Sequence, residues 1–330
     1  MTDDLIARPA VPAPAPEERR RPNWRRLTQR YGAAAALAAL FLYNAVATPY
    51  FLTFQSIVNI QLRQAAPVAI VALGMALVIA TGGIDLSVGS VMAIAGQVGA
   101  LVLLGGSGAF TAWGAALAVA LVCGLFNGVL VARYGVQPII ATLILFIAGR
   151  GIAQLITDGK LQTFDDPTFQ WLGLGRVGTL PAQILVLVVV ALVVAAVIRW
   201  STFGRYVVAV GGNETSSRLA GVPVARTKLL AYGTSGLLAG LVGLIVIGNT
   251  SASDANNVGL GTELDAIAAV AVAGVPLTGG RMTVAGTVIG ALTLKLLQNT
   301  LIAHGIPREI AQMIQGAVIV LALYLQRSGR

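Results

Sequence analysis

Charged residues are scarce in this chain of 330 residues, at 11% of the total, while hydrophobic residues make up 56%. A soluble globular domain carries about 25% charged residues. So few charges cannot cover a water-facing surface for a chain of this length, and lipid must cover it instead. The 39 glycines agree with this interpretation, because helices that pack together in a membrane favour small residues.

Residues that build metal centres and catalytic sites are also scarce. Cys123 is the single cysteine and His304 the single histidine, so neither an intrachain disulfide nor a cysteine–histidine metal site can form. The sequence contains no G-x-x-x-x-G-K-[ST] phosphate loop, no H-E-x-x-H and no G-x-S-x-G motif. We therefore expect no cofactor, no metal and no catalytic residue, and any ATP hydrolysis must come from another subunit.

Acidic residues are fewer than basic residues, so the formal net charge is +9. Many of the basic residues are arginines between Arg8 and Arg30, and no basic stripe with interleaved aromatic residues follows them. The excess is therefore not typical of nucleic-acid binding. It fits a membrane protein whose basic residues hold loops in the cytoplasm.

The N-terminal region is predicted to be a disordered basic cytoplasmic tail over residues 1–30. The apolar run Ala33–Tyr43, followed by Ala45-Val46-Ala47, has two interpretations. It is either a signal peptide with an A-x-A cleavage site or a first membrane span that is retained. We favour the retained span, because the charged segment before it is unusually long for a signal peptide.

Apolar segments then recur along the whole chain, and a membrane-spanning helix needs about 20 such residues. They predict an all-α polytopic membrane protein with about ten spans, although several segments are short or rich in glycine, so eight or nine is the alternative. The predicted spans are 31–51, 65–81, 86–104, 111–131, 137–157, 181–199, 229–248, 263–279, 283–303 and 309–326.

The distribution of charge predicts the orientation. With the N-terminus in the cytoplasm and alternating spans, most of the 22 basic residues fall in cytoplasmic segments, as the positive-inside rule requires. The transmembrane domain is thus expected at 31–326, with a C-terminal cytoplasmic tail at 327–330. Two long loops stand out, an outer loop at 158–180 and a cytoplasmic loop at 200–228.

One stretch, Gly82–Ser90, interrupts apolar sequence with glycines, one acid and two hydroxyl residues. A carboxylate such as that of Asp85 is costly in lipid unless it is paired or hydrated. Two roles stay open for Asp85 and Ser87. They either cap the helix that follows or take a direct part in a polar pathway.

Other polar residues lie within the predicted spans. Arg150 could bind a hydroxylated substrate, extend to the interface or pair with an acid. Gln97, Asn127 and Gln154 could line a polar pathway, or they could form hydrogen bonds between helices, which is the more common role of buried amides in membranes.

The cytoplasmic loop is predicted to contain a short helix. Gly212, Asn213 and Glu214 come just before it, and Ala220-Gly221-Val222 end it ahead of a proline. A short helix between two spans at the inner surface suits docking to a peripheral motor protein. The alternative is an interfacial helix without a partner.

At this point several separated motifs, in one order, match a known family. Over residues 55–326 the chain resembles the permease subunits of bacterial ABC importers for ribose, xylose, arabinose, galactose and related sugars. The motifs are Arg63-Gln64-Ala65-Ala66-Pro67, Ala80–Gly89, Thr202-Phe203-Gly204-Arg205-Tyr206, Gly211-Gly212-Asn213-Glu214, Ala220-Gly221-Val222, Glu263–Ala268 and Gly279-Gly280-Arg281.

Within that family the chain is most similar to a galactofuranose permease, on the residues Ala148–Thr157 and Ala252–Asn257. It departs from the pattern at Gly274-Val275-Pro276-Leu277, where many members carry a glycine pair before a hydroxyl residue. The proline restricts the backbone at this point. This departure weakens the inference of the family's substrate for this chain more than the inference of the general function.

The resemblance implies the ABC importer permease fold in the bacterial inner membrane, with transport by alternating access. The implied partners are a cytoplasmic ABC ATPase, a periplasmic sugar-binding protein and a second permease chain, either identical or related. The rival function is an ion-coupled secondary transporter of small polar solutes. That class needs intramembrane acids and often inverted repeats, whereas Asp85 is nearly alone and the sequence shows no convincing repeat. A membrane enzyme would need a nucleophile or metal cluster, which the chain lacks.

Overall fold

The computed structural model describes residues 24–327, and the side chains of residues 32–320. The predicted tails therefore lie largely outside the described residues. In chain order the helices are α1 (Trp24–Ala47), the π-helix η1 (Gln55–Leu62), α2 (Arg63–Ala80), α3 (Val88–Leu104), α4 (Ala109–Ala132), α5 (Pro138–Leu155), α6 (Pro167–Leu174), α7 (Ala182–Trp200), α8 (Thr202–Gly212), α9 (Glu214–Leu219), α10 (Val224–Thr250), α11 (Thr262–Val272), α12 (Val284–Ala303) and α13 (Arg308–Arg327).

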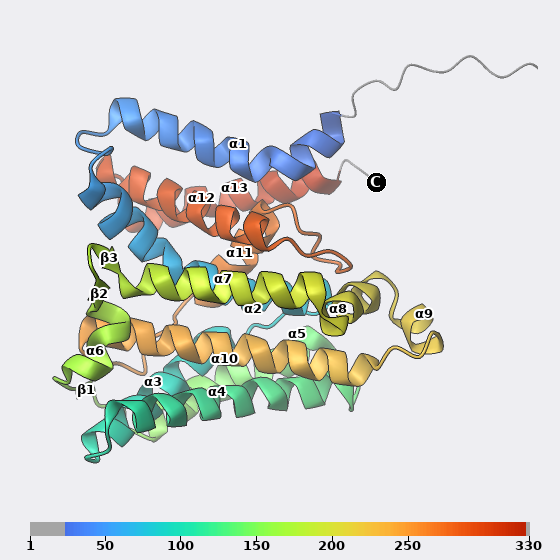
Figure 1. Ribbon diagram of the computed structural model, residues 1–330, viewed down its shortest axis with the longest axis horizontal. Coiled ribbons are helices and arrows are strands. Elements are labelled where there is room, and N and C mark those ends of the chain that lie inside the picture. The colour runs from blue at the N-terminus through green and yellow to red at the C-terminus, as the bar shows by residue number, and fades with distance from the viewer. Residues whose placement is uncertain (1–23, 328–330) are drawn as a thin grey trace, which may run out of the picture.

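The long helices lie side by side, roughly along one axis (Figure 1). At one end lie α6 and two short antiparallel pairs, in which β1 (Gln162–Thr163) pairs with β4 (Ala252–Ser253) and β2 (Arg176–Val177) with β3 (Leu180–Pro181). We call this the strand end. At the other end lie α8, α9 and both ends of the described chain, and we call this the α9 end.

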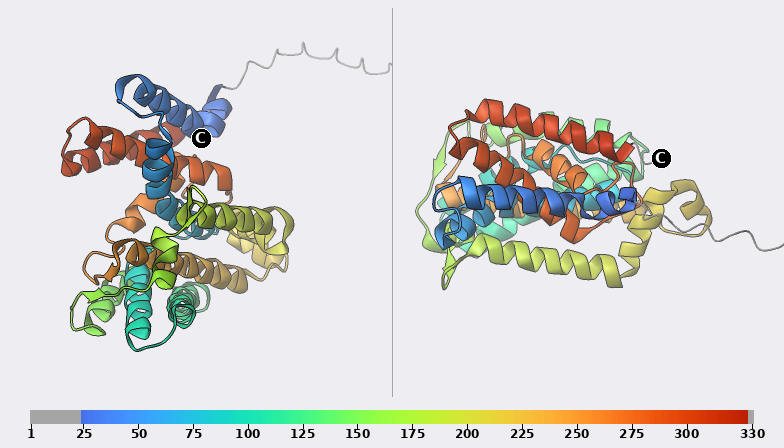
Figure 2. Two further views of the ribbon diagram at one scale, coloured as in Figure 1. Left: turned by 60° about the vertical axis from the view of Figure 1, so that its left-hand side comes forward. Right: turned by 90° about the horizontal axis from the view of Figure 1, so that it is seen from above.

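The helices form three groups across the bundle. Figure 2 shows α1, α12 and α13 on one side and α3, α4 and α5 on the other. Helices α2, α7, α10 and α11 lie between them (Figure 1). Packing follows the same division, since α10 contacts α2, α3 and α4, while α12 contacts α1, α2, α11 and α13.

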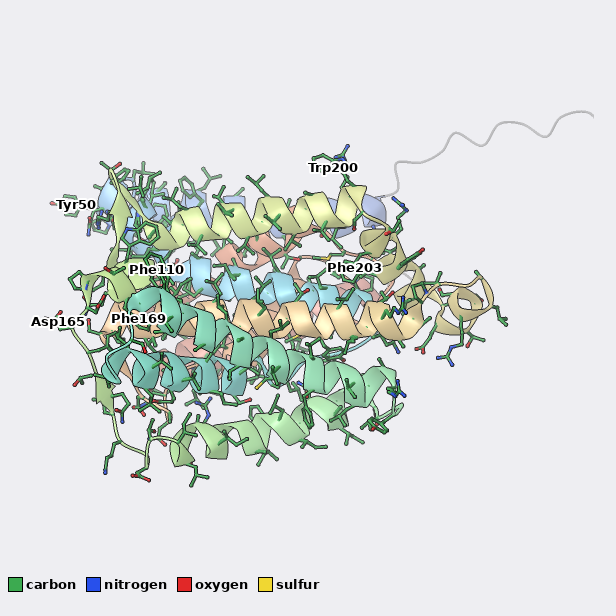
Figure 3. All side chains as sticks on the ribbon, turned by 60° about the horizontal axis from the view of Figure 1, so that its bottom comes forward. Tyr50, Phe110, Asp165, Phe169, Trp200 and Phe203 are labelled. Carbon is green, nitrogen blue, oxygen red and sulfur yellow. The ribbon has the colours of Figure 1, made fainter. Side chains whose placement is uncertain are left out.

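Six helical segments are long and apolar enough to cross a membrane: η1 with α2, α4, α5, α7, α10 and α12. Helix α3 and the part of α1 from Gly32 to Ala47 are shorter apolar helices. Aromatic side chains mark both ends of the bundle, with Tyr50 and Phe110 at one and Trp200 and Phe203 at the other (Figure 3). This placement is typical of the two membrane interfaces. The all-α membrane fold is confirmed, and the count of ten spans stays a prediction.

One predicted span is corrected. The segment 263–279 was expected to be helical throughout, but α11 ends at Val272. Gly274, Gly279 and Gly280 have φ values of +77°, +93° and +79°. Left-handed backbone cannot continue a right-handed helix, and glycine is the residue that adopts it without strain.

Two stretches of non-helical backbone lie inside the bundle. One is the segment 81–87 between α2 and α3, and the other is the segment 251–261 between α10 and α11. The second segment reaches the first turn of α3, directly after the first break, because a Cβ on Gly259 would lie 2.9 Å from the Gly89 Cα. Irregular backbone at membrane depth is tolerated only where protein or a water-filled cavity surrounds it.

These two breaks belong to an inverted arrangement that the sequence did not reveal. Helices α2 and α10 are antiparallel, because Arg63 at the start of α2 donates a hydrogen bond to Asn249 near the end of α10. Each is followed by a break, a shorter helix (α3 or α11) and a helix that packs on the other half (α4 on α10, α12 on α2). The inverted arrangement that secondary transporters often have is thus present in the fold, although the sequence shows no repeat.

Helix α10 is buried along most of its length because glycines let its neighbours approach closely. A Cβ on Gly243 would lie 2.6 Å from the Met92 carbonyl oxygen in α3, and one on Gly236 would lie 2.5 Å from the Ala120 carbonyl oxygen in α4. In a membrane, close packing replaces the hydrophobic drive that water would provide. The bundle therefore depends on these glycines.

We predict that Gly243→Ala lowers the free energy of unfolding by about 1–3 kcal/mol, the usual cost of overpacking, because the added methyl group must displace α3. The measurement is the thermal unfolding midpoint of the purified protein in detergent. Gly114→Ala on α4 is the matched control, since its Cβ would meet no atom within 4 Å. Equal midpoints for both variants would contradict the role of Gly243.

Candidate functional site

The carboxylate of Asp85 lies in the 81–87 break and is 1% exposed. Its Oδ1 accepts hydrogen bonds from the Ser87 backbone nitrogen at 3.1 Å and the Ser87 hydroxyl at 2.6 Å. Its Oδ2 accepts from the Ser235 hydroxyl on α10 at 2.8 Å. The Asn127 amide of α4 donates to the Ser87 hydroxyl at 2.7 Å. We call these four residues the Asp85 network.

The Asp85 network joins the start of α3 to α4 and α10. A buried carboxylate is tolerated when its oxygens are hydrogen-bonded, and here both oxygens accept bonds from the protein itself. Asp85 has a capping role, because it accepts the Ser87 N–H directly before α3. The Ser87 side chain makes no hydrogen bond to the first turn of α3 and links Asp85 to Asn127 instead. The geometry therefore favours a structural role for both residues over direct contact with a solute. Ser235 was missed from the sequence, because nothing in α10 marks it as the partner of a residue 150 positions earlier.

Gln97 does not join this network. It is fully buried in α3, and neither atom of its amide has a partner among the described side chains. The Ser253 hydroxyl, next to Gly96, is also buried without a described partner. Buried polar groups of this kind commonly bind ordered water, which makes this region suited to hydration.

Arg150 and Gln154 act together on one segment. The Arg150 guanidinium donates to the carbonyl oxygens of Ala255 and Val258, each at 2.7 Å. One turn along α5, the Gln154 amide donates to the Asn256 side chain at 2.7 Å. Both side chains therefore hold the 251–261 break in place. The predicted pathway residues thus separate into three groups, the Asp85 network, Gln97, and the Arg150–Gln154 pair.

The predicted short helix in the cytoplasmic loop exists as α9. The Asn213 side chain caps it by accepting a hydrogen bond from the Ser216 backbone nitrogen at 2.9 Å. Gly221, with φ of +80°, provides the turn that follows. Gly212, Asn213, Ala220 and Gly221 are exposed, while Glu214 and Val222 are half-buried.

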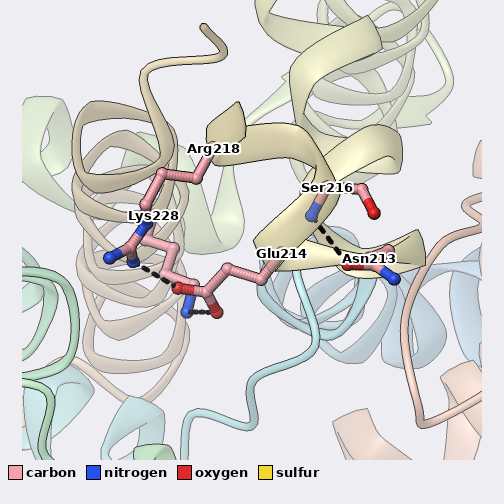
Figure 4. A network of polar contacts seen from close by, with 5 residues as sticks. All are labelled: Asn213, Glu214, Ser216, Arg218 and Lys228. Carbon is pink, nitrogen blue, oxygen red and sulfur yellow. Dashed lines mark hydrogen bonds and ion pairs between the residues drawn. The ribbon is translucent and has the colours of Figure 1, made fainter. Parts of the chain in front are cut away.

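Glu214 ties α9 to the start of α10 (Figure 4). Its carboxylate accepts hydrogen bonds from Lys228 Nζ at 2.6 Å and from Arg218 at 3.0 Å. The hydrogen bond from Lys228 is the main cause that holds the pKa of Glu214 below its usual range. Leu219 at the end of α9 is 85% exposed, so α9 presents an apolar side chain on a fixed support.

Helix α8 connects α9 to the bundle. A Cβ on Gly211 would overlap the Ala80 carbonyl oxygen and the Gly280 nitrogen. The Gly280 nitrogen also donates a hydrogen bond to that carbonyl, at 3.0 Å. The end of α2, α8 and the turn after α11 therefore meet at one point, directly before the break that carries Asp85.

A polar cavity of about 500 Å³ lies on the other side of the bundle centre. We call it the outer cavity, because it reaches toward the strand end. The cavity is not visible in the sequence, since each helix contributes only one or two of its polar residues. Its lining is Asn59, Arg63, Gln64, Pro67, Val68, Met92, Gln183, Val242, Val246, Asn249, Leu260, Thr262, Asp265, Lys295 and Arg308.

The structure is thus a bundle of apolar helices that encloses buried polar networks, with a capped helix projecting from one end. Residues 56–323 match the family of "Branched-chain amino acid transport system / permease component" proteins. The chain belongs to this permease family.

Curated relatives agree with this assignment. The permease is 40% identical over 299 residues to the galactofuranose transporter permease protein YtfT of Escherichia coli, covering 88% of this chain and 87% of that one. It is 38% identical over 292 residues to the E. coli ribose import permease protein RbsC (87% and 90% covered). It is 35% identical over 269 residues to the fructose import permease protein FruF of Bifidobacterium longum (80% and 76%).

The chain is therefore a multi-pass inner-membrane protein, the permease subunit of an ABC importer and not an enzyme. Permeases of this class work with an ATPase and a substrate-binding protein. The family level of the resemblance found from the motifs is confirmed. The roles of the individual residues stay predictions that rest on the geometry above.

We predict that Asp85→Asn lowers the free energy of unfolding by about 1–3 kcal/mol. With its oxygen toward Ser87, the amide would keep those two hydrogen bonds as weaker neutral ones, and the Ser235 hydroxyl would have to turn from donating to accepting. The measurement is again the unfolding midpoint in detergent. Asp158→Asn is the control, because its side chain is 80% exposed. An unchanged midpoint for Asp85→Asn would contradict the capping role.

We also predict a pH-dependent effect of Glu214→Gln on the unfolding midpoint. A carboxylate whose pKa is lowered on folding contributes stability above its unfolded pKa, about 4.3 for glutamate, and that stability is lost as the pH falls through the folded pKa. At pH 7 the unfolding midpoint of the variant should be lower than that of the wild type, and the two midpoints should become equal below about pH 4. Thr215→Ala, on the same helix, should give a difference that does not vary with pH.

Proposed function

We propose that this permease forms the membrane pathway of an ATP-driven importer for a monosaccharide, galactofuranose or a related sugar. The substrate class rests on three relatives that match 80% or more of this chain. Their names are those of galactofuranose, ribose and fructose permeases. The family description names branched-chain amino acids, but the specific relatives favour a sugar.

The α9 end is proposed to face the cytoplasm, with both termini on that side. Arg199, Arg205, Arg218, Arg226 and Lys228 belong to α7–α10 at this end of the bundle. Such a cluster of basic residues supports the orientation, because basic residues are retained on the cytoplasmic side.

Helix α9 is proposed to be the docking element for the cytoplasmic ABC ATPase. Exposed Leu219 offers an apolar contact. The ion pairs of Glu214 with Arg218 and Lys228 hold α9 against α10, so that α9 would move together with the bundle when the ATPase moves it. Movement of α9 and α8 would pass through Gly211 to the end of α2. That route leads to the break between α2 and α3, where a change in helix position would open the pathway in alternating access.

The complete importer is proposed to contain a periplasmic sugar-binding protein and a second permease chain, either identical or related. The binding protein would deliver the sugar at the strand end. The pathway candidates remain Asp85, Ser87, Gln97, Asn127, Arg150 and Gln154. All but Gln97 shape the two breaks around which the pathway would open, and Gln97 would offer its unpartnered amide next to it.

An ion-coupled secondary transporter, the rival function, also uses broken helices in an inverted arrangement, but the relatives of this chain are permeases of ABC importers. For a secondary transporter, uptake would stop when an uncoupler collapses the ion gradient while ATP is maintained. For an ABC importer, uptake would continue under an uncoupler and stop when ATP is depleted.

We predict that Leu219→Asp abolishes co-purification of the permease with its ATPase and reduces uptake of radiolabelled sugar in cells to background. A charge in place of the exposed leucine would oppose an apolar contact. Leu174→Asp at the strand end is the control for co-purification, because Leu174 is also an exposed leucine at a helix end. Wild-type co-purification and uptake with Leu219→Asp would contradict the docking role of α9.

A further inference from the structure

The outer cavity extends from the strand end toward the middle of the bundle. Arg63 donates to Asn249 and to the Gly173 carbonyl oxygen, so this part of the cavity wall lies at the ends of α10 and α6. From there the cavity extends inward to Lys295, in the middle of α12. Its volume of about 500 Å³ lies within the range of about 300–1,000 Å³ typical of small-molecule sites.

The wall of the cavity is polar and contains opposite charges. Lys295, Arg63 and Arg308 contribute cations and Asp265 contributes an anion. Between these charges stand side chains that both donate and accept hydrogen bonds: Asn59, Gln64, Gln183, Asn249 and Thr262. The cavity therefore presents both donors and acceptors across a short space.

Lys295 and Asp265 line the same cavity but do not form a direct ion pair. The salt bridges found among the side chains of residues 32–320 include neither residue. Lys295 Nζ instead donates to the Gln298 side chain at 2.8 Å, and Asp265 accepts from Gln315 at 3.3 Å. Charges held within a membrane bundle without a direct partner are costly, and they usually mark a substrate pathway.

We propose that the outer cavity is a sugar-binding site of the permease itself, in which a hydroxyl group bridges Lys295 and Asp265. A hydroxyl accepts from the ammonium and donates to the carboxylate at once. A neutral polyhydroxylated solute can satisfy both groups in this way, because the bridge needs no charge on the solute. This inference rests on the proposed import of a monosaccharide.

The site is built to release the sugar as well as to hold it. None of the described residues that line the cavity is aromatic, so these residues would hold the sugar by hydrogen bonds without the large apolar contact that an aromatic side chain supplies. A passage site must bind weakly enough for the substrate to leave. The permease would thus check the hydroxyl pattern of the sugar after the binding protein has released it.

The test uses the complete importer, reconstituted in proteoliposomes with its ATPase and with binding protein saturated with radiolabelled sugar. The variants are Lys295→Met and Asp265→Asn. The exposed pair Lys160 and Asp158, 3.7 Å apart at the strand end, supplies the matched controls Lys160→Met and Asp158→Asn. Sugar uptake and ATP hydrolysis are measured in the same vesicles.

We expect both cavity variants to lower uptake about tenfold, the effect of losing one hydrogen bond to a charged group, while ATP hydrolysis stays near the wild-type rate. The controls should leave both rates unchanged, and Lys295→Arg should restore part of the uptake. Among monodeoxy analogues of the sugar, the one that lacks the bridging hydroxyl should be transported equally by the wild type and Lys295→Met.

Wild-type uptake in both cavity variants would overturn the inference and leave the importer intact. Equal loss of uptake and ATP hydrolysis, with no rescue by Lys295→Arg, would also overturn it, because it would indicate a structural role. Failure of the wild-type complex to import any monosaccharide would instead defeat the proposed function. As a second variant, Val246→Phe fills the cavity without removing a charge, and undiminished uptake with it would contradict passage through this cavity.

Discussion

In the hydrocarbon core of a membrane, every backbone N–H and C=O group needs a partner within the protein. A continuous helix meets this requirement by itself, but this chain leaves the helical path twice at depth, at 81–87 and at 251–261. Both breaks are possible because neighbouring helices enclose them. In the first break, Asp85 accepts hydrogen bonds from Ser87 and from Ser235 of α10. Arg150 donates to carbonyl oxygens of the second break.

Those enclosed breaks also organise the rest of the permease. Glycines at Gly236 and Gly243 bring α10 close enough to α3 and α4 to cover the first break. The contact of Gly211 with the end of α2 places the α9 docking surface directly next to the same break. Because α8 touches the end of α2, a movement of α9 would have a physical route to the first break, with α2 and α8 moving together.

The division of labour in the importer follows from this arrangement. The chain carries no nucleotide-binding motif, so the energy must come from a partner subunit, for which α9 is the proposed docking element. At the opposite end, the outer cavity places charged and amide groups from α2, α7, α10, α11, α12 and α13 around one space. Selection of the solute would then be shared between the binding protein and the permease, instead of resting on the binding protein alone.

The sequence by itself determined the membrane embedding, the position of most helices and the capped helix at Asn213, because hydropathy and capping are local properties of the chain. The family motifs added the permease assignment. The tertiary structure alone decided that α11 stops at Val272, that Asp85 meets Ser235, and that Asp265 and Lys295 share a cavity. Those pairings join residues far apart in the chain, and only the packing of the helices determines which polar side chains come together.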